Sequence, residues 1–428
     1  MRGRAQCYDE LRQFCEDTPL IDCHDHSMPR GNPYQDALVM AIEGYFGHDI
    51  ISASSEPDFS FLLDTSRPLA ERWPVLEKAW KRTRHTGYAR VTRLVLKKFY
   101  DEDDLTLEAL ARIQEQLLDV SDEKVFDDIL EEAKIVARLE DLPVDGNQVL
   151  SGELKLMPRS RLTISLPPYH GFRCQDDIQR VVSPLGRRVL TLDEYLEACR
   201  EIFEGYKRYG AVAFKDQSAY SRPLDYGNPA RQDAEKIFNW LMEDPRRNVS
   251  YPDGLKPLDD FLFHAFMRMA REMDLPVQIH TGHMAGTRND IVKTNAIGLT
   301  RLLEMHREVR FDLFHANWPY SGELLFLGKN YPNVCIDFCW ANIVDPIYCQ
   351  QMFKQALSCV PHGKIHGYGS DFHALPDRSW AHARIARDNI AIALSDMVEM
   401  EYLGLDEAKE AARAWLFDNA NSFFRLGL

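Results

Sequence analysis

Short apolar or β-branched runs recur along the chain, and amphipathic stretches of helical length lie between them. Several runs are almost continuously hydrophobic, as is typical of strands buried on both faces of a parallel sheet. The alternation predicts repeated strand–helix units. The predicted strands are 20–23, 134–139, 161–166, 211–215, 276–280, 309–315, 333–338 and 365–370.

Eight such units favour a closed (β/α)8 barrel over an open sheet. The stretch "LDEYLEACREIFEGYKRYG", between the third and fourth predicted strands, has the pattern of a helix that packs against such a barrel. The expected fold class is therefore α/β, with residues 1–428 as a single barrel domain.

One interval breaks this rhythm, because residues 24–133 separate the first two strands. Connections in strand–helix units usually span a few residues. In "DLTLEALARIQEQLLDVSDEKVFDDILEEA", Leu, Ile and Val recur at spacings of three and four, which indicates helices. We expect residues 30–133 to be a helical insertion over the barrel mouth, since it leaves the carboxyl end of the first strand. A shorter insertion rich in turn formers, 216–233, follows the fourth strand.

The composition favours small-molecule chemistry. A formal net charge of −15 argues against a nucleic-acid surface, which needs clustered Lys and Arg. The charged start "MRGRAQCYDELRQFCED" and the lack of an 18-residue apolar run argue against a secretion signal and a membrane span. We therefore expect a cytoplasmic protein that binds neither nucleic acid nor membrane.

Nine scattered cysteines fit a reducing compartment better than a disulfide scaffold. Cys335 and Cys339 lie four residues apart, on one face if the segment is a strand, but no second cysteine pair completes a zinc-ribbon spacing. We expect both to be small buried residues rather than metal ligands.

Side chains suited to metal binding follow the predicted strands at a common place. His24 and His26 point to one face after the first strand, whereas Asp25 points away. This pair alone is equally compatible with one surface histidine and one bonded to a loop carbonyl. Four more strand ends, however, carry Lys215, His280, His315 and Asp371. Strand carboxyl ends converge at one mouth of a barrel, and imidazoles with a carboxylate suit Zn²⁺, Fe²⁺ or Mn²⁺.

This placement resembles the amidohydrolase superfamily, whose TIM barrels carry His-x-His on strand 1, a carboxylated lysine or glutamate on strand 4, histidines on strands 5 and 6, and aspartate on strand 8. The chain is most similar to the amidohydrolase-related metal-dependent hydrolases and decarboxylases, and more distantly to uronate isomerases. The stretches that carry the resemblance are "IHTG" (279–282), "FHANWPY" (314–320), "YPNVCIDF" (331–338), "YGSDF" (368–372) and "DNANSFFRL" (418–426). Residues 30–133 contribute nothing to it.

The resemblance implies one or two divalent metal ions, with Zn²⁺ the expected ion and Fe²⁺ or Mn²⁺ as alternatives. Their ligands would be His24, His26, Lys215, His280, His315 and Asp371. Lys215 would be either a carboxylated bridge between two metals or a free ammonium that binds a substrate carboxylate. Lys215 and Asp371 would be the catalytic residues, with Asp371 carrying the proton that metal-activated water gives up.

The expected activity is hydrolysis at an amide, ester or lactone carbon of a small polar substrate. A sugar-acid isomerase is an alternative, supported by the long insertion, although such isomerases lack a ligand like His315. A non-oxidative decarboxylase and a non-catalytic binding protein are further alternatives, and association into homo-oligomers is left open. The candidate substrate-binding residues follow strands 1, 4, 5, 6 and 8, and they are Arg30, Arg222, His283, Trp318 and Arg378.

Overall fold

The computed structural model describes all residues except 1, 27–30, 143 and 145. Its central feature is an eight-stranded sheet in the order β1 to β8, in which each neighbouring pair is parallel. The strands are β1 (Leu20–Asp25), β2 (Ile135–Glu140), β3 (Ser160–Ser165), β4 (Ala213–Asp216), β5 (Val277–Ile279), β6 (Phe311–Leu313), β7 (Val334–Asp337) and β8 (Ile365–His366).

Backbone hydrogen bonds close the seam between β1 and the segment after β8. The amide of Cys23 donates to the carbonyl of Tyr368 (3.2 Å), and the amide of Asp371 donates to the carbonyl of His24 (2.9 Å). The predicted barrel is therefore confirmed. The last strand ends at His366, earlier than predicted, and the chain turns before it reaches Asp371, whose φ is +58°.

Helices surround the barrel between successive strands. Those after β2 are α9 (Gly146–Ser151), α10 (Pro167–His170), α11 (Gln175–Val182), α12 (Leu192–Tyr209), α13 (Arg231–Glu243), α14 (Lys256–Met273), α15 (Thr300–Met305), α16 (Ser321–Asn330), α17 (Ala341–Val344), α18 (Pro346–Cys359), α19 (Pro376–Glu399), α20 (Leu405–Arg413) and α21 (Asn419–Phe424). The helix α1 (Arg2–Asp17) precedes β1 and packs along α19.

The helix α12 shows why these sequences form helices where they do. Thr191 and Glu194 form a capping box at its start, and Gly210, with φ of +117°, ends it in a left-handed conformation. Its apolar face, including Tyr195, Ile202 and Phe203, is fully buried in the main hydrophobic core.

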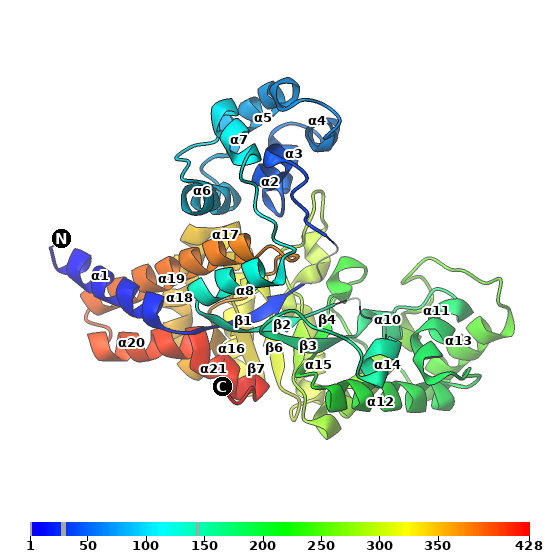
Figure 1. The fold of residues 1–428 in the computed structure, drawn as a ribbon. Coiled ribbons are helices and arrows are strands. Elements are labelled where there is room, and N and C mark those ends of the chain that lie inside the picture. The colour runs from blue at the N-terminus through cyan, green and yellow to red at the C-terminus, as the bar shows by residue number, and fades with distance from the viewer. Residues whose placement is uncertain (1, 27–30, 143, 145) are drawn as a thin grey trace.

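The residues between β1 and β2 form helices, as predicted. They are α2 (Ala37–Ile42), α3 (Phe46–Ala53), α4 (Glu56–Leu63), α5 (Leu69–Thr83), α6 (Gly87–Tyr100), α7 (Leu107–Gln114) and α8 (Glu123–Glu132). Helices α2 to α7 lie together above the barrel, whereas α8 returns to its wall (Figure 1). A second hydrophobic cluster joins this helical layer to Phe314, Trp340, Ile343 and Phe372, which follow β6, β7 and β8. The layer therefore packs over the carboxyl ends of these strands.

No helix in the described part of the chain is both long and apolar enough to cross a membrane.

The close approach of α6 to α17 can be tested. A Cβ added at Gly87 would lie 2.0 Å from the carbonyl oxygen of Ile343, and this backbone oxygen cannot move without shifting α17. We expect Gly87→Ala to lower the free energy of unfolding by about 2 kcal/mol in urea titrations. Gly322→Ala is the matched control, because nothing lies within 4 Å of its added Cβ. Equal stability of the two variants would contradict this packing.

Candidate metal centre

Four histidines and one aspartate meet at the carboxyl ends of the strands. His24 lies in β1 and His26 directly follows it, while His280, His315 and Asp371 follow β5, β6 and β8. All are buried except His26, which is partly exposed. Asp25, by contrast, points away and pairs with Arg138 of β2 at 2.6 Å. The structure thus brings five of the six predicted ligands into one cluster.

The carboxylate of Asp371 contacts three of the four imidazoles, and the fourth, His280, contacts His315. Its Oδ1 lies 3.2 Å from Nε2 of His26 and 3.4 Å from Nε2 of His24, and these two nitrogens are 3.0 Å apart. Its Oδ2 lies 3.8 Å from Nε2 of His315, which is 3.0 Å from Nδ1 of His280. Nitrogen and oxygen donors from four strands therefore face one another.

Backbone carbonyl groups orient three of these rings. A carbonyl oxygen only accepts, so the ring nitrogen beside it carries the proton, and the other nitrogen faces the cluster. The three hydrogen bonds run from Nδ1 of His26 to Asp141 O (2.8 Å), from Nε2 of His280 to His283 O (2.7 Å), and from Nδ1 of His315 to Cys339 O (3.1 Å).

The pair of His280 and His315 fits a bound cation. Burial lowers the pKa of both rings, to about 4 for His315, so both are neutral at pH 7. Each neutral ring has one N–H, which is used on a carbonyl. Two lone pairs therefore face each other at 3.0 Å with no proton between them. A divalent cation removes this repulsion, and the imidazole and carboxylate donors are those preferred by Zn²⁺, Fe²⁺ or Mn²⁺.

The pair of His26 and Asp371 holds a proton instead. Burial by itself would lower the pKa of His26, but its hydrogen bond to Asp371 and the charge of that carboxylate raise it to about 9. Burial would raise the pKa of Asp371, yet the hydrogen bond from His26 and nearby positive charge keep it low. Since metal ligands must be deprotonated, this proton would leave when a metal binds.

Several residues that follow β6, β7 and β8 adopt backbone conformations that are rare outside glycine. His315, Trp340 and Asp371 have φ values of +64°, +59° and +58°, and they follow β6, β7 and β8. Each such conformation costs about 1–3 kcal/mol, and such residues concentrate at functional sites.

Lys215, in β4, is buried beside this cluster. Its Nζ lies 4.6 Å from the ring centroid of Phe314, in cation–π geometry. After burial, the charge of Lys215 is the next largest cause that lowers the pKa of His24. The ammonium is therefore close enough to act on the cluster electrostatically.

Aromatic side chains form one wall of the site. The ring of His283 stands edge-on to Trp318, at 5.3 Å between centroids, and lies 4.7 Å from Trp340. The hydroxyl of Tyr88 is 3.4 Å from Nε2 of His283, and the hydroxyl of Tyr45 donates to the carbonyl of Asp371. The predicted residues His283 and Trp318 thus lie at the site. The tyrosines come from the helical layer, and no motif in the sequence pointed to them.

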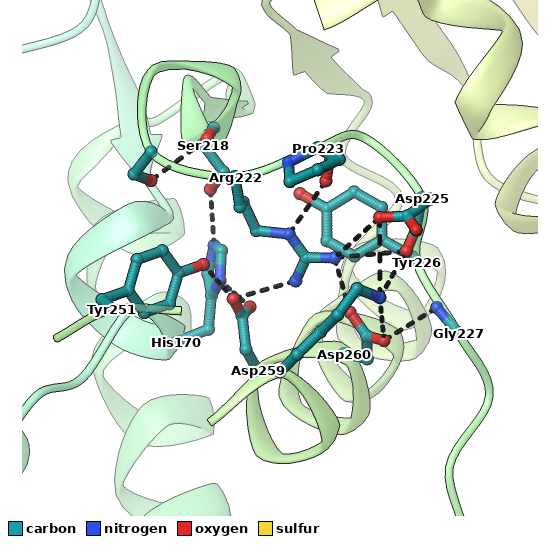
Figure 2. A network of polar contacts seen from close by, with 12 residues as sticks. His170, Ser218, Arg222, Pro223, Asp225, Tyr226, Gly227, Tyr251, Asp259 and Asp260 are labelled. Carbon is teal, nitrogen blue, oxygen red and sulfur yellow. Dashed lines mark hydrogen bonds and ion pairs between the residues drawn. The ribbon is translucent and has the colours of Figure 1, made fainter. Parts of the chain in front are cut away.

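Two predicted substrate-binding arginines lie elsewhere, so their assignment to the substrate was wrong. Arg222 is fully buried and pairs with Asp259 (2.8 Å) and Asp260 (2.6 Å), within a network that also holds His170 (Figure 2). Arg378 is buried between α19 and the helical layer, where it donates to the carbonyl of Met40. Arg30 lies outside the described residues.

A cavity of about 460 Å³ opens beside the histidine cluster. His26 is one of its lining residues, and residues that end or follow β2, β3 and β4 form much of the rest. Its polar lining residues include Asp141, Thr163, Ser165, Arg180 and Gln217. A small polar molecule can therefore reach His26 from this side.

Comparisons with known proteins agree with this geometry. Residues 198–426 match the amidohydrolase family model. Protein fluG of Emericella nidulans is 27% identical over 226 residues, which are 50% of this chain but only 26% of that protein. The chain thus spans about a quarter of that relative.

Other similarities cover the whole chain. A uronate isomerase of Thermotoga neapolitana is 20% identical, and the alignment covers 99% of this chain and 97% of that protein. The crystal structure of a uronate isomerase from Thermotoga maritima superimposes with a TM-score of 0.79, covering 98% of this chain and 97% of that one at 16% identity. The structural match supports the barrel fold.

The buried role of Arg222 can be tested by stability. Removing its guanidinium leaves Asp259 and Asp260 less well paired in the interior, so we expect Arg222→Gln to lower the free energy of unfolding by about 3 kcal/mol. Arg231→Gln is the control, because Arg231 pairs with Asp193 at the surface, where ion pairs contribute less than about 1 kcal/mol. Urea unfolding of both variants measures the difference. Similar small effects would show that the network is not needed for stability.

Proposed function

The chain belongs to the amidohydrolase family, and we propose that it is a metal-dependent hydrolase acting on an amide, ester or lactone carbon of a small polar substrate. The observation that carries this proposal is the pair of His280 and His315, whose unprotonated nitrogens face each other at 3.0 Å. With His24, His26 and Asp371, the pair makes a set of five side chains that can bind metal. A His-x-His motif and one aspartate alone would supply only three.

These five residues would hold the metal. A divalent metal bound there supplies a Lewis acid that polarises a carbonyl group and lowers the pKa of water. The hydrogen bonds from His26, His280 and His315 to backbone carbonyls keep their donor nitrogens directed toward the cluster.

Asp371 is the proton carrier in this proposal. The hydrogen bond from His26 lowers the pKa of its carboxyl despite burial, and a bound metal ion would keep the carboxylate ionised once that proton has left. It can therefore accept a proton from the attacking water and return it to the leaving group. The hydroxyl of Tyr45 donates to its backbone carbonyl, which helps to keep the carboxylate in place.

The substrate would lie between the cavity and the aromatic wall. His283 and Trp318 present ring faces and edges to it, and Lys215 places a cation beside the cluster. The charge of Lys215 suits a substrate with an anionic group. Arg180, in the lining of the cavity, offers a second positive charge.

A uronate-isomerase-like activity is the second candidate. It is favoured by similarity to uronate isomerases over nearly the whole chain, including the insertion after β1.

An isotope experiment separates the two candidates. We expect lactones or N-acyl amino acids to be turned over in H₂¹⁸O with one heavy oxygen entering the product carboxylate per turnover, as hydrolysis requires. Uronates and aromatic acids complete the screen, and mass spectrometry of the products is the measurement. Conversion of a uronate to an isomer of equal mass, without turnover of the other classes, would establish the isomerase and refute the hydrolase.

Metal removal tests the centre itself. We expect treatment with a chelator to lower the melting temperature and zinc to restore it, because a ligand at about one hundred times its Kd stabilises the folded state by about 2.7 kcal/mol. His24→Ala and His26→Ala should abolish most of this response. His85→Ala is the control, since His85 is an exposed histidine away from the cluster. Unchanged metal content in the first two variants would refute the centre.

A further inference from the structure

Cys339, which follows β7, lies at the edge of the histidine cluster. One donor atom from each of Cys339, His315 and Asp371 lies within 4.8 Å of the others, and all three residues are buried. Asp371 belongs equally to the group it forms with His24 and His26. The carboxylate of Asp371 is therefore shared between two groups of donors. One group has the imidazole nitrogens of His24 and His26, and the other has a nitrogen of His315 and the sulfur of Cys339.

The surrounding backbone fixes the position of this sulfur. The amide of Cys339 donates to Oδ1 of Asp337 (2.6 Å), and its carbonyl accepts from Nδ1 of His315. A Cβ added at Gly369 would lie 2.6 Å from Sγ of Cys339. The thiol therefore packs against Gly369, in the segment that leads to Asp371, where any larger residue would clash with it. This packing holds the sulfur near His315 and Asp371.

Among the described residues, Asp371 is the carboxylate that contacts His315, and it is shared with His24 and His26. The Nζ of Lys215 lies 4.6 Å from the centroid of the Phe314 ring, so it adds positive charge beside the cluster. A second anionic donor beside His315 would offset the positive charges of Lys215 and of a bound metal ion.

We propose that Cys339 is a thiolate ligand of the metal centre, on the side of His280 and His315. This rests on the metal centre proposed above. When a metal ion binds, the S–H bond of Cys339 breaks, the sulfur bonds to the ion, and the proton passes to solvent. A set of nitrogen, oxygen and sulfur donors favours Zn²⁺ or Co²⁺ over Mn²⁺ or Mg²⁺.

Cobalt substitution of the full-length protein tests the proposal. After removal of the native metal and reconstitution with Co²⁺, we expect a sulfur-to-cobalt charge-transfer band in the near ultraviolet, together with visible d–d bands. Cys339→Ser should lose the charge-transfer band, keep the d–d bands, and bind Co²⁺ at least about tenfold more weakly. X-ray absorption of the unaltered zinc protein should show sulfur at about 2.3 Å from zinc, which needs no variant to fold.

Two control variants make the result specific. Cys335→Ser alters β7, the strand that precedes Cys339, at a residue outside the cluster, so the band should remain. Cys23→Ser alters a separate buried group of Cys23, Asp337 and His366, and here too the band should remain. The proposal is overturned if Co²⁺ binds without a charge-transfer band, or if the band depends on Cys23 rather than Cys339. Failure of Co²⁺ to bind at all would instead refute the metal centre.

Discussion

Three backbone carbonyl oxygens determine which nitrogens face the middle of the barrel mouth. They accept one N–H group from each of His26, His280 and His315, and so turn the opposite nitrogen of each ring toward the cluster. On His26 that nitrogen carries the proton shared with Asp371, which must leave before a cation binds there. Each carbonyl belongs to a loop at the carboxyl end of a strand, so the tautomers depend on the path of the backbone rather than on other side chains. The chemistry proposed for the cluster follows from this arrangement.

The barrel was predictable because its signals are local. Each strand is a short apolar run, and the parallel order follows from the alternation with helices. The convergence of His24, His26, His280, His315 and Asp371 was also predictable, since each lies at or after the carboxyl end of a strand. The end of β8 was not, because residues 367–370 continue the predicted run although only Ile365 and His366 pair with β7.

Pairing partners that lie far apart in sequence limited the prediction of the site. Arg222 follows β4 as a substrate-binding arginine would, but Asp259 and Asp260, on α14, take up its charge in the interior. Tyr45 and Tyr88 could not be predicted for the same reason, because they reach the site from the helical layer, far from it in the sequence. Cys335 and Cys339 are both buried, as the sequence predicted. The spacing of two cysteines in the sequence could not show that Cys339 lies near His315 and Asp371, which follow other strands.

The left-handed backbone at His315, Trp340 and Asp371 has a consequence for how tightly a cation can bind. These conformations are adopted when the chain folds, so the donor groups of the cluster are ordered before any ion arrives. Binding then requires little further loss of conformational entropy from the protein. The affinity is limited instead by the energy needed to strip water from the ion and to release the proton shared by His26 and Asp371.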